Sequence, residues 1–167
     1  MDIYNAFFEA FYLAGIANRF VPNIFVSEES YYRWSLDVES KSKQVMHAYN
    51  KAKLLFDDEE LITALKEGFH AFSKFNGSVN AYVSSGEPSI IINKAWETVS
   101  ATNPTARNRD YMLLYQNKEL NENFVKLCST SHTDEIQQNI EEYMSIVGND
   151  NFDAKFEKYL KISNEQN

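Results

Sequence analysis

The segment from Ser27 to Phe56 reads SEESYYRWSLDVESKSKQVMHAYNKAKLLF, and its apolar residues recur at steps of three, four or seven. These residues are Tyr31, Trp34, Val38, Val45, Tyr49, Ala52 and Phe56. An α-helix brings residues at such separations onto one face, so the pattern predicts a long amphipathic helix. Ser27 can cap its start, and Glu28 and Glu29 suit the positive end of the helix dipole.

A second apolar repeat predicts an N-terminal helix from about residue 2 to residue 18, with Asp2 as its N-cap. The residues at helical spacing are Ile3, Phe7, Ala10, Phe11, Ala14 and Ala17. An adjoining face carries Tyr4, Phe8 and Tyr12. A break is expected at residues 21–23. Because two adjoining faces are apolar, this helix should be covered on more than one side and lie centrally.

A third helix is predicted after Phe56. Asp57 is placed to cap it, and Glu60 three residues later completes a capping box. Its apolar stripe consists of Leu61, Leu65, Phe69 and Phe72. Asn76 and Gly77 are favoured at helix C-termini, so the helix is expected to end there.

The segment from residue 78 to residue 100 permits two interpretations. One is a small β-hairpin near 78–92 with its turn at 85–87, supported by the alternating apolar residues Val79, Ala81 and Val83. The other is a helix with Pro88 in its first turn. The inward residues of that helix would be Ile92, Ala95, Trp96 and Val99. We favour the helix, because the helical spacing continues over several turns.

The C-terminal half continues the helical pattern. Asn103 and Pro104 mark a helix start, and a bend is expected near Asn117. Thr133 is expected to cap the next helix and Gly148 to end it. The inward residues of that helix are Ile136, Ile140, Tyr143 and Val147, and a last helix carries Phe152, Phe156, Tyr159 and Leu160.

These patterns predict an all-α protein, a compact bundle of six to seven helices. With 167 residues, of which 44% are hydrophobic, the chain suits one domain with one core. We expect that single helical domain to span residues 1–162 and residues 163–167 to form a frayed tail. No internal repeat and no linker emerges from the sequence.

The cell compartment is expected to be the cytoplasm. The one cysteine, Cys128, cannot form an internal disulfide, and its apolar neighbours are typical of a buried thiol. Asp2 and Glu9 interrupt the apolar start of the chain and argue against a signal peptide. No run of eighteen apolar residues is present, so no membrane span is predicted.

The acidic residues are concentrated near the C-terminus. Between Lys126 and Lys155 there is no Lys or Arg, and the net charge of the chain is −8. The part from Glu119 to Asn167 holds ten acidic and four basic residues. A charge distribution of this kind influences which partners a protein attracts, more than how it folds.

The predicted helix after residue 133 would gather these charges on one surface. Asp134, Gln138 and Glu141 share one stripe at 3.6 residues per turn, flanked by Glu135 and Glu142. The candidate partner-binding residues are Asp134, Glu135, Gln138, Glu141, Glu142, Asp150 and Asp153. The alternative, an ordinary solvated helix face, is strong, because such faces are usually charged and Asp134 and Glu135 lie where the helix dipole stabilises an anion. The lack of Lys and Arg favours an interaction surface, because exposed helices commonly use Lys–Glu pairs.

Other chemistries have weaker signals, and the sequence assigns no catalytic, cofactor-binding or metal-ligating residue. A magnesium-dependent all-α nucleotide pyrophosphohydrolase would use paired carboxylates on two helices, for which Glu119 with Glu122 and Asp150 with Asp153 are candidates. His47, His70 and His132 share no predicted face with each other or with Cys128. The aromatic residues Tyr32, Tyr82, Trp96 and Tyr115 are candidates for anchors in an interface.

The sequence thus predicts an acidic protein-binding inhibitor rather than an enzyme. A basic, nucleic-acid-handling protein is the expected partner, for example a bacterial nuclease toxin neutralised by its immunity protein, or a host defence protein blocked by a phage antagonist. The inhibitor would cover the cationic active-site groove of that partner. Direct binding to nucleic acid or membrane is not expected, and the oligomeric state is left open. The alternatives are the pyrophosphohydrolase and a helical scaffold or regulatory subunit.

Overall fold

The computed structural model describes the backbone of residues 2–24 and 27–164, and the side chains of residues 3–16, 27–157 and 159. Within these residues the chain forms eight α-helices and one 3-10 helix, and no strand. The predicted all-α class is confirmed. The α-helices exceed the expected six or seven because the segment 111–128 is divided into two of them.

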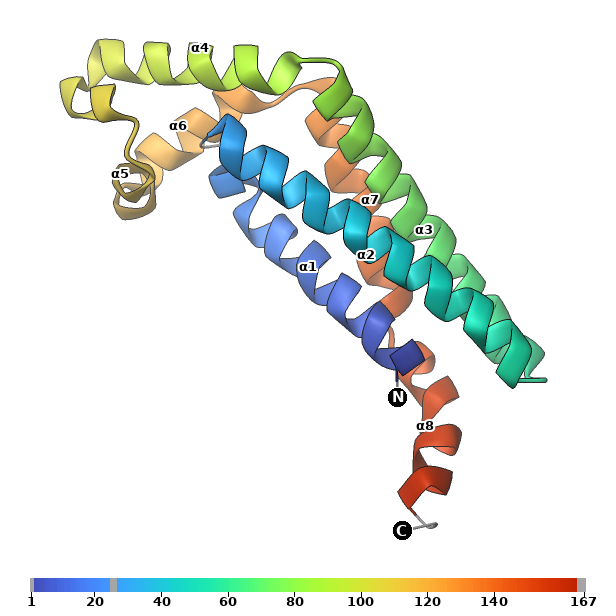
Figure 1. Cartoon of the computed structure of the whole chain (residues 1–167). Coiled ribbons are helices and arrows are strands. Elements are labelled where there is room, and N and C mark those ends of the chain that lie inside the picture. The colour runs from blue at the N-terminus through green and yellow to red at the C-terminus, as the bar shows by residue number, and fades with distance from the viewer. Residues whose placement is uncertain (1, 25–26, 165–167) are drawn as a thin grey trace.

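Four long helices form the body of the molecule: α1 (Asp2–Ile24), α2 (Glu28–Leu55), α3 (Glu59–Ser84) and α7 (Ser131–Val147). Each packs against two others, in the cyclic order α1, α2, α3, α7 and back to α1. Neighbours in this ring run in opposite directions (Figure 1). The body is therefore an antiparallel four-helix bundle, in which α2 and α7 are diagonally opposite.

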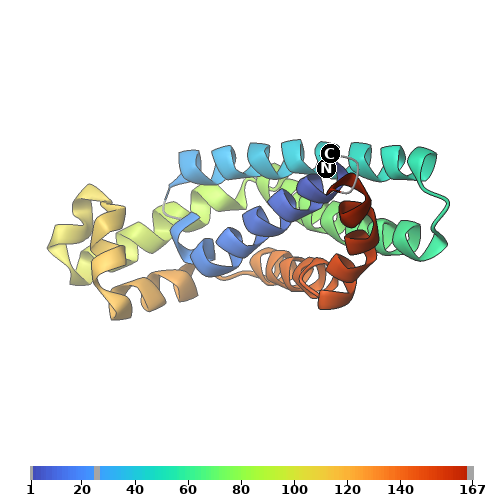
Figure 2. The same cartoon turned by 90° about the horizontal axis from the view of Figure 1, so that it is seen from below.

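The remaining elements lie at the two ends of this bundle. One end carries α4 (Glu87–Thr102), the 3-10 helix η1 (Pro104–Asn108), α5 (Tyr111–Gln116) and α6 (Lys118–Cys128). These elements pack on one another and connect α3 to α7. The other end carries α8 (Asp150–Asn164), as Figures 1 and 2 both show.

Buried aromatic side chains hold α7 in the bundle. The rings of Phe72 on α3 and Tyr143 on α7 lie 4.9 Å apart, and both residues are fully buried. The Tyr143 hydroxyl donates a hydrogen bond of 2.8 Å to the backbone carbonyl of Phe7 on α1. A smaller cluster joins α4 to α6, where the rings of Trp96 and Phe124 lie 4.7 Å apart. The contacts of Tyr143 hold one side of α7 against α1 and α3, and they therefore determine which residues of α7 face solvent.

Several predicted helix signals are confirmed. Ser27 caps α2 and accepts a hydrogen bond of 3.0 Å from the backbone N–H of Ser30. Pro88 lies in the first turn of α4, so the favoured helix is correct, and the hairpin near 78–92 is not formed because these residues belong to α3 and α4. Asn117 separates α5 from α6 and caps the latter, and Gly148 ends α7.

Two predicted helix ends are wrong. The break at 21–23 is instead the last turn of α1, because a proline removes only one N–H donor from that turn. The end at Asn76 and Gly77 is also wrong, since α3 continues to Ser84. Val79 and Tyr82 are fully buried, so the apolar stripe of α3 extends past the glycine, and its packing outweighs the low helix propensity there.

Two predicted caps are each displaced by a few residues. Asp58 rather than Asp57 caps α3 and accepts a hydrogen bond of 3.0 Å from the Leu61 N–H. Thr130 rather than Thr133 caps α7, and Thr133 completes the capping box from inside the first turn. In both places a second residue with the same capping chemistry lies nearby, and the packing of the helix selects between them.

Other expectations near the ends of the chain are corrected or lie outside the described residues. The helix start at Asn103 is a 3-10 turn. The N-terminal helix is not covered on both faces, because Phe8 and Tyr12 are 52% and 66% exposed. Asp2 is the first residue of α1 rather than its cap, and the side chains of Ala17 and Leu160 lie outside the described residues. Helix α8 continues to Asn164, and residues 165–167 of the expected tail lie outside the described residues.

The structure supplies no candidate for a membrane span. Along the described part of the chain, no helix is both long enough and apolar enough to cross a bilayer.

Two glycines should respond in opposite ways to replacement by alanine. A Cβ at Gly77, inside α3, meets nothing within 4 Å, so Gly77→Ala should raise the free energy of unfolding by about 0.5–1 kcal/mol. A Cβ at Gly148 would lie 2.6 Å from the Met144 carbonyl oxygen and 2.8 Å from the Phe11 ring. We expect Gly148→Ala to lower the free energy of unfolding by about 1–3 kcal/mol. Urea denaturation of the two variants checks this, and equal shifts of the same sign would contradict the packing at Gly148.

Candidate functional site

The outward side of α7 carries part of the predicted acidic surface. Ile136, Ile140, Tyr143 and Val147 are all buried, as predicted. On the opposite side of the helix Asp134, Gln138 and Glu141 are exposed, and we call these three residues the outer stripe. Glu141 accepts a hydrogen bond of 2.9 Å from the side chain of Gln137. The predicted division of α7 into a core face and a charged face is therefore correct.

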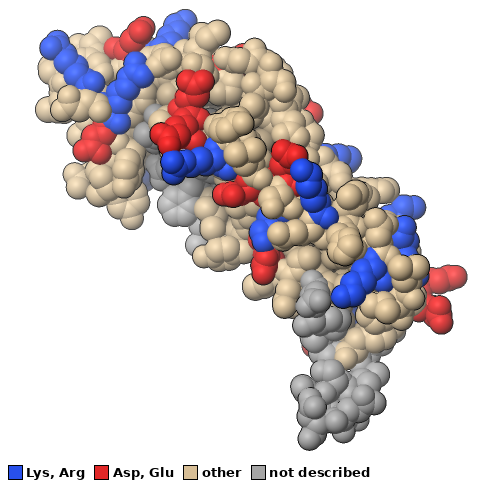
Figure 3. All heavy atoms as spheres, viewed as in Figure 1, with Lys and Arg blue, Asp and Glu red and all other residues tan. Residues whose placement is uncertain are grey.

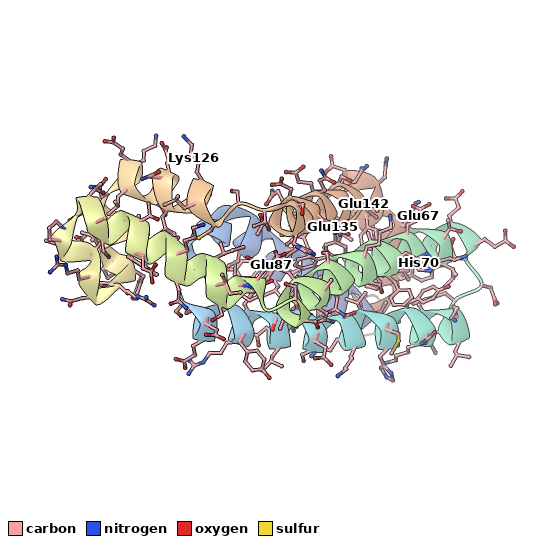
Figure 4. The ribbon with its side chains drawn as sticks, turned by 90° about the horizontal axis from the view of Figure 1, so that it is seen from above. Glu67, His70, Glu87, Lys126, Glu135 and Glu142 are labelled. Carbon is pink, nitrogen blue, oxygen red and sulfur yellow. The ribbon has the colours of Figure 1, made fainter. Side chains whose placement is uncertain are left out.

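The flank of α7 that faces α3 is partly neutralised. Glu142 is bound by Lys74 of α3, with Nζ–Oε distances of 2.8 and 3.2 Å. The absence of Lys and Arg between Lys126 and Lys155 therefore does not leave Glu142 without a nearby cation, because a lysine distant in sequence reaches it across the helix interface. Glu135 lies seven residues earlier on the same flank and is exposed. Figure 4 shows both glutamates on this flank and Glu67 on α3.

Asp150 and Asp153 lie in the first turn of α8, directly after α7 ends. Both are exposed, and acidic residues are stabilised there by the positive end of the helix dipole. Asp153 also accepts a hydrogen bond of 3.1 Å from the Tyr4 hydroxyl of α1. Burial raises the pKa of Tyr4, and the hydrogen bond to Asp153 and the negative charge of Asp153 raise it further. We call these two aspartates the end pair.

Asp153 borders a small aromatic groove between α1, the end of α7 and α8. The groove has a volume of about 160 Å³. Its lining consists of Tyr4, Phe8, Phe11, Val147, Gly148, Phe152 and Asp153. The rings of Tyr4 and Phe8 are stacked with their centroids 6.1 Å apart. A carboxylate beside exposed ring faces is suited to a side chain that has an apolar stem and a cationic end, such as that of Lys or Arg.

Among the described side chains, no Lys or Arg lies within 4 Å of a carboxylate of Asp134, Glu135, Glu141, Asp150 or Asp153. The face crossed by α2 differs, because acidic and basic side chains are interspersed there (Figure 3). Among the side chains that the structure describes, α2 forms ion pairs between Glu29 and Arg33, between Glu39 and Lys43, and between Lys41 and Glu9 of α1. Uncompensated negative charge is thus a feature of the α7 side and of the start of α8.

The carboxylate pairs considered for metal binding are far apart. Glu119 and Glu122 are exposed on α6, and Glu122 lies 3.8 Å from Lys118. Asp150 and Asp153 lie on α8, at the opposite end of the molecule (Figure 1). The two pairs therefore do not converge on one metal position. Over the part of the chain that the structure describes, no group of three His, Cys, Asp or Glu residues is arranged to hold a metal ion.

Cys128 is buried, as predicted, and burial raises the pKa of its thiol to about 12. The thiolate is the reactive form, and an ordinary cysteine has a pKa of about 8.5. At pH 8 we therefore expect a thiol-specific reagent to modify Cys128 about a thousandfold more slowly in the native protein than in denaturant. Stopped-flow and manual-mixing labelling measure the two rates. A native rate within about tenfold of the denatured one would contradict a buried, protonated thiol.

A polar contact where α3, α4 and α7 meet was not predicted from any sequence pattern. His132 at the start of α7 lies 2.9 Å from the carboxylate of Glu87 at the start of α4. Its ring also stacks on Tyr82 of α3, with centroids 5.8 Å apart. Of the four aromatic anchor candidates, Tyr82 and Trp96 are core residues. Tyr32 and Tyr115 are exposed, so these two remain available to a partner.

No protein-family model, curated protein or solved structure matches this chain. Its function must therefore be inferred from the arrangement of its own side chains.

Proposed function

We propose that this protein binds and inhibits a basic, nucleic-acid-handling protein, and that it does so in the cytoplasm. A nuclease toxin held in check by an immunity protein, or a host defence protein blocked by a phage antagonist, would be such a pair. The observation that carries the proposal is the outer stripe together with the end pair, whose carboxylates are exposed and have no described cation within ion-pair distance.

Electrostatic attraction would bring the two proteins together. Carboxylates that lack local counter-ions create a negative potential that accelerates the encounter with a positive surface and disfavours acidic partners. Asp134 and Glu141 are separated by seven residues, about 10 Å along the helix axis. They can therefore meet two different cationic side chains of a partner.

The aromatic groove would supply the buried anchor of the complex. A Lys or Arg from the partner can place its apolar stem against Tyr4 and Phe8 and its charge beside Asp153. Anchors of this kind contribute more to affinity than exposed charge pairs do, because water is excluded from the contact.

Inhibition would follow from occlusion. A surface that binds nucleic acid is positive because it must neutralise phosphates, and the same cations would bind the carboxylates of α7. While this protein covers them, the nucleic acid cannot bind.

Affinity capture from the cell of origin tests the proposal. After nucleic acids have been digested, the immobilised protein should retain a basic protein at about 50 mM salt and release most of it at about 500 mM salt. Recovery of only acidic or neutral proteins would contradict the proposal. Retention that does not depend on salt would instead favour the scaffold alternative, in which the contact is apolar.

A further inference from the structure

Helix α2 carries its charges in two halves of opposite sign. Residues 28–39 contain four acidic residues and one basic residue, Arg33. Residues 41–53 contain four lysines and no acidic residue. The acidic residues are Glu28, Glu29, Asp37 and Glu39, and the lysines are Lys41, Lys43, Lys51 and Lys53. Two such helices attract each other when they lie antiparallel, and they repel each other when they lie parallel.

The outward face of α2 also exposes large apolar side chains. They are Tyr32, Leu36, Met46 and Leu54, and the exposed fractions of Leu36 and Met46 are 47% and 44%. The opposite face packs on α1 and α3. Helix α2 runs along one edge of the molecule in two opposed views (Figures 2 and 4). Its outward face is therefore accessible over the length of the helix, about 42 Å.

We propose that two copies of this protein pair through their α2 helices, antiparallel, about a two-fold axis near Lys41. In this register, residues equally far from Lys41 on its two sides meet. Leu36 then contacts Met46 of the second copy, and Glu39 meets Lys43 of the second copy. Each of these contacts occurs twice, because a two-fold interface uses the same surface on both subunits.

The charges of the central turns support the same register. Glu39 and Lys43 already form an ion pair of 2.6 Å within each chain, and both side chains remain partly exposed, at 42% and 70%. In the dimer they would form a ring of four alternating charges around the axis. Glu29 in the first turn of α2 would meet Lys53 in the last turn of α2 of the second copy. Exposed ion pairs are weak individually, so we expect a reversible dimer with a dissociation constant in the micromolar range, about 10–100 µM.

This dimer goes beyond the proposed function and does not depend on it. Because α2 and α7 are diagonally opposite in the bundle, the paired molecules would keep both outer stripes facing solvent. Failure of the dimer would leave the inhibitor proposal unchanged, and the reverse also holds.

Sedimentation velocity at concentrations from about 1 to 500 µM tests the pairing. The wild-type protein should show a monomer–dimer equilibrium that weakens as salt is added. Glu39→Lys and Lys43→Glu should each raise the dissociation constant about tenfold or more, since each places like charges together twice. An equimolar mixture of the two variants should form a heterodimer within about threefold of the wild-type affinity, because opposite charges then meet at both positions.

Two further variants complete the test. The double variant Glu39→Lys with Lys43→Glu should dimerise like the wild type, since the ring of charges is preserved with its signs exchanged. Lys118→Glu makes the same chemical change at an exposed i,i+4 pair on α6 and should leave dimerisation unaltered. A wild-type protein that stays monomeric throughout the range would overturn the proposal. So would a mixture that associates no better than the single variants.

Discussion

Phe72→Ala should lower the free energy of unfolding by about 3–5 kcal/mol. Phe72 has no exposed surface, and its ring lies 5.4 Å from that of Phe75 and 4.9 Å from that of Tyr143. Replacing the ring by a methyl group loses apolar contacts and leaves a cavity between α3 and α7, because the neighbouring helices cannot close the gap completely. Urea denaturation measures the change.

Phe8→Ala is the matched control for this prediction. It removes the same atoms from a residue that is 52% exposed, and we expect a loss below about 1 kcal/mol. If both variants lose about the same stability, then α7 is not held in the bundle by the contact described. The outer stripe would in that case have no fixed orientation, and its use as a rigid docking surface would be contradicted as well.

Asp134→Lys combined with Glu141→Lys should reduce the association rate with the captured partner by about tenfold or more at low salt. Both residues are exposed on the outer stripe, so the change should not disturb the core. The dependence of the association rate on salt should also become shallower, because fewer opposite charges steer the encounter. Stopped-flow mixing at several salt concentrations measures both quantities.

Asp37→Lys combined with Glu97→Lys controls for net charge. Both residues are exposed, Asp37 on α2, which is diagonally opposite α7, and Glu97 on α4, and the substitutions raise the net charge from −8 by the same four units. The control should lower the association rate only slightly, since its charges are distant from the contact. Equal effects of the two double variants would mean that the overall charge acts, and that the outer stripe is not a specific surface.

The parts of the fold that depend on local repetition were predictable from the sequence. The cap at Ser27 and the inward face of α7 follow from residues within a few turns of one another, because the helix itself places them. Helix ends were less predictable. Gly77 is an adequate stop signal by propensity, but the buried residues Val79 and Tyr82 beyond it stabilise the helix by more than the roughly 1 kcal/mol that a glycine costs.

The sequence was sufficient to predict which residues of α7 in the candidate site are exposed, but not which residues of other helices the site contacts. The helical spacing of the apolar residues in α7 was sufficient to place Asp134 and Glu141 on the solvent side. Lys74 and Glu142 are separated by 68 residues, and Tyr4 and Asp153 by 149. Pairings over such distances are set by how the helices assemble, and no local pattern in one sequence encodes them. The aromatic groove depends on the same assembly, because α1, α7 and α8 each contribute to it.

Competition with nucleic acid is the most direct test of the claim that the acidic face of α7 covers a cationic surface. The captured partner is first bound to a fluorescently labelled oligonucleotide, and the fluorescence anisotropy is followed as this protein is added. The wild type should release the oligonucleotide at about one equivalent when both proteins are well above their dissociation constant, and the Asp134→Lys, Glu141→Lys variant should release far less. A stable complex that holds this protein and the oligonucleotide together on the partner would contradict the claim.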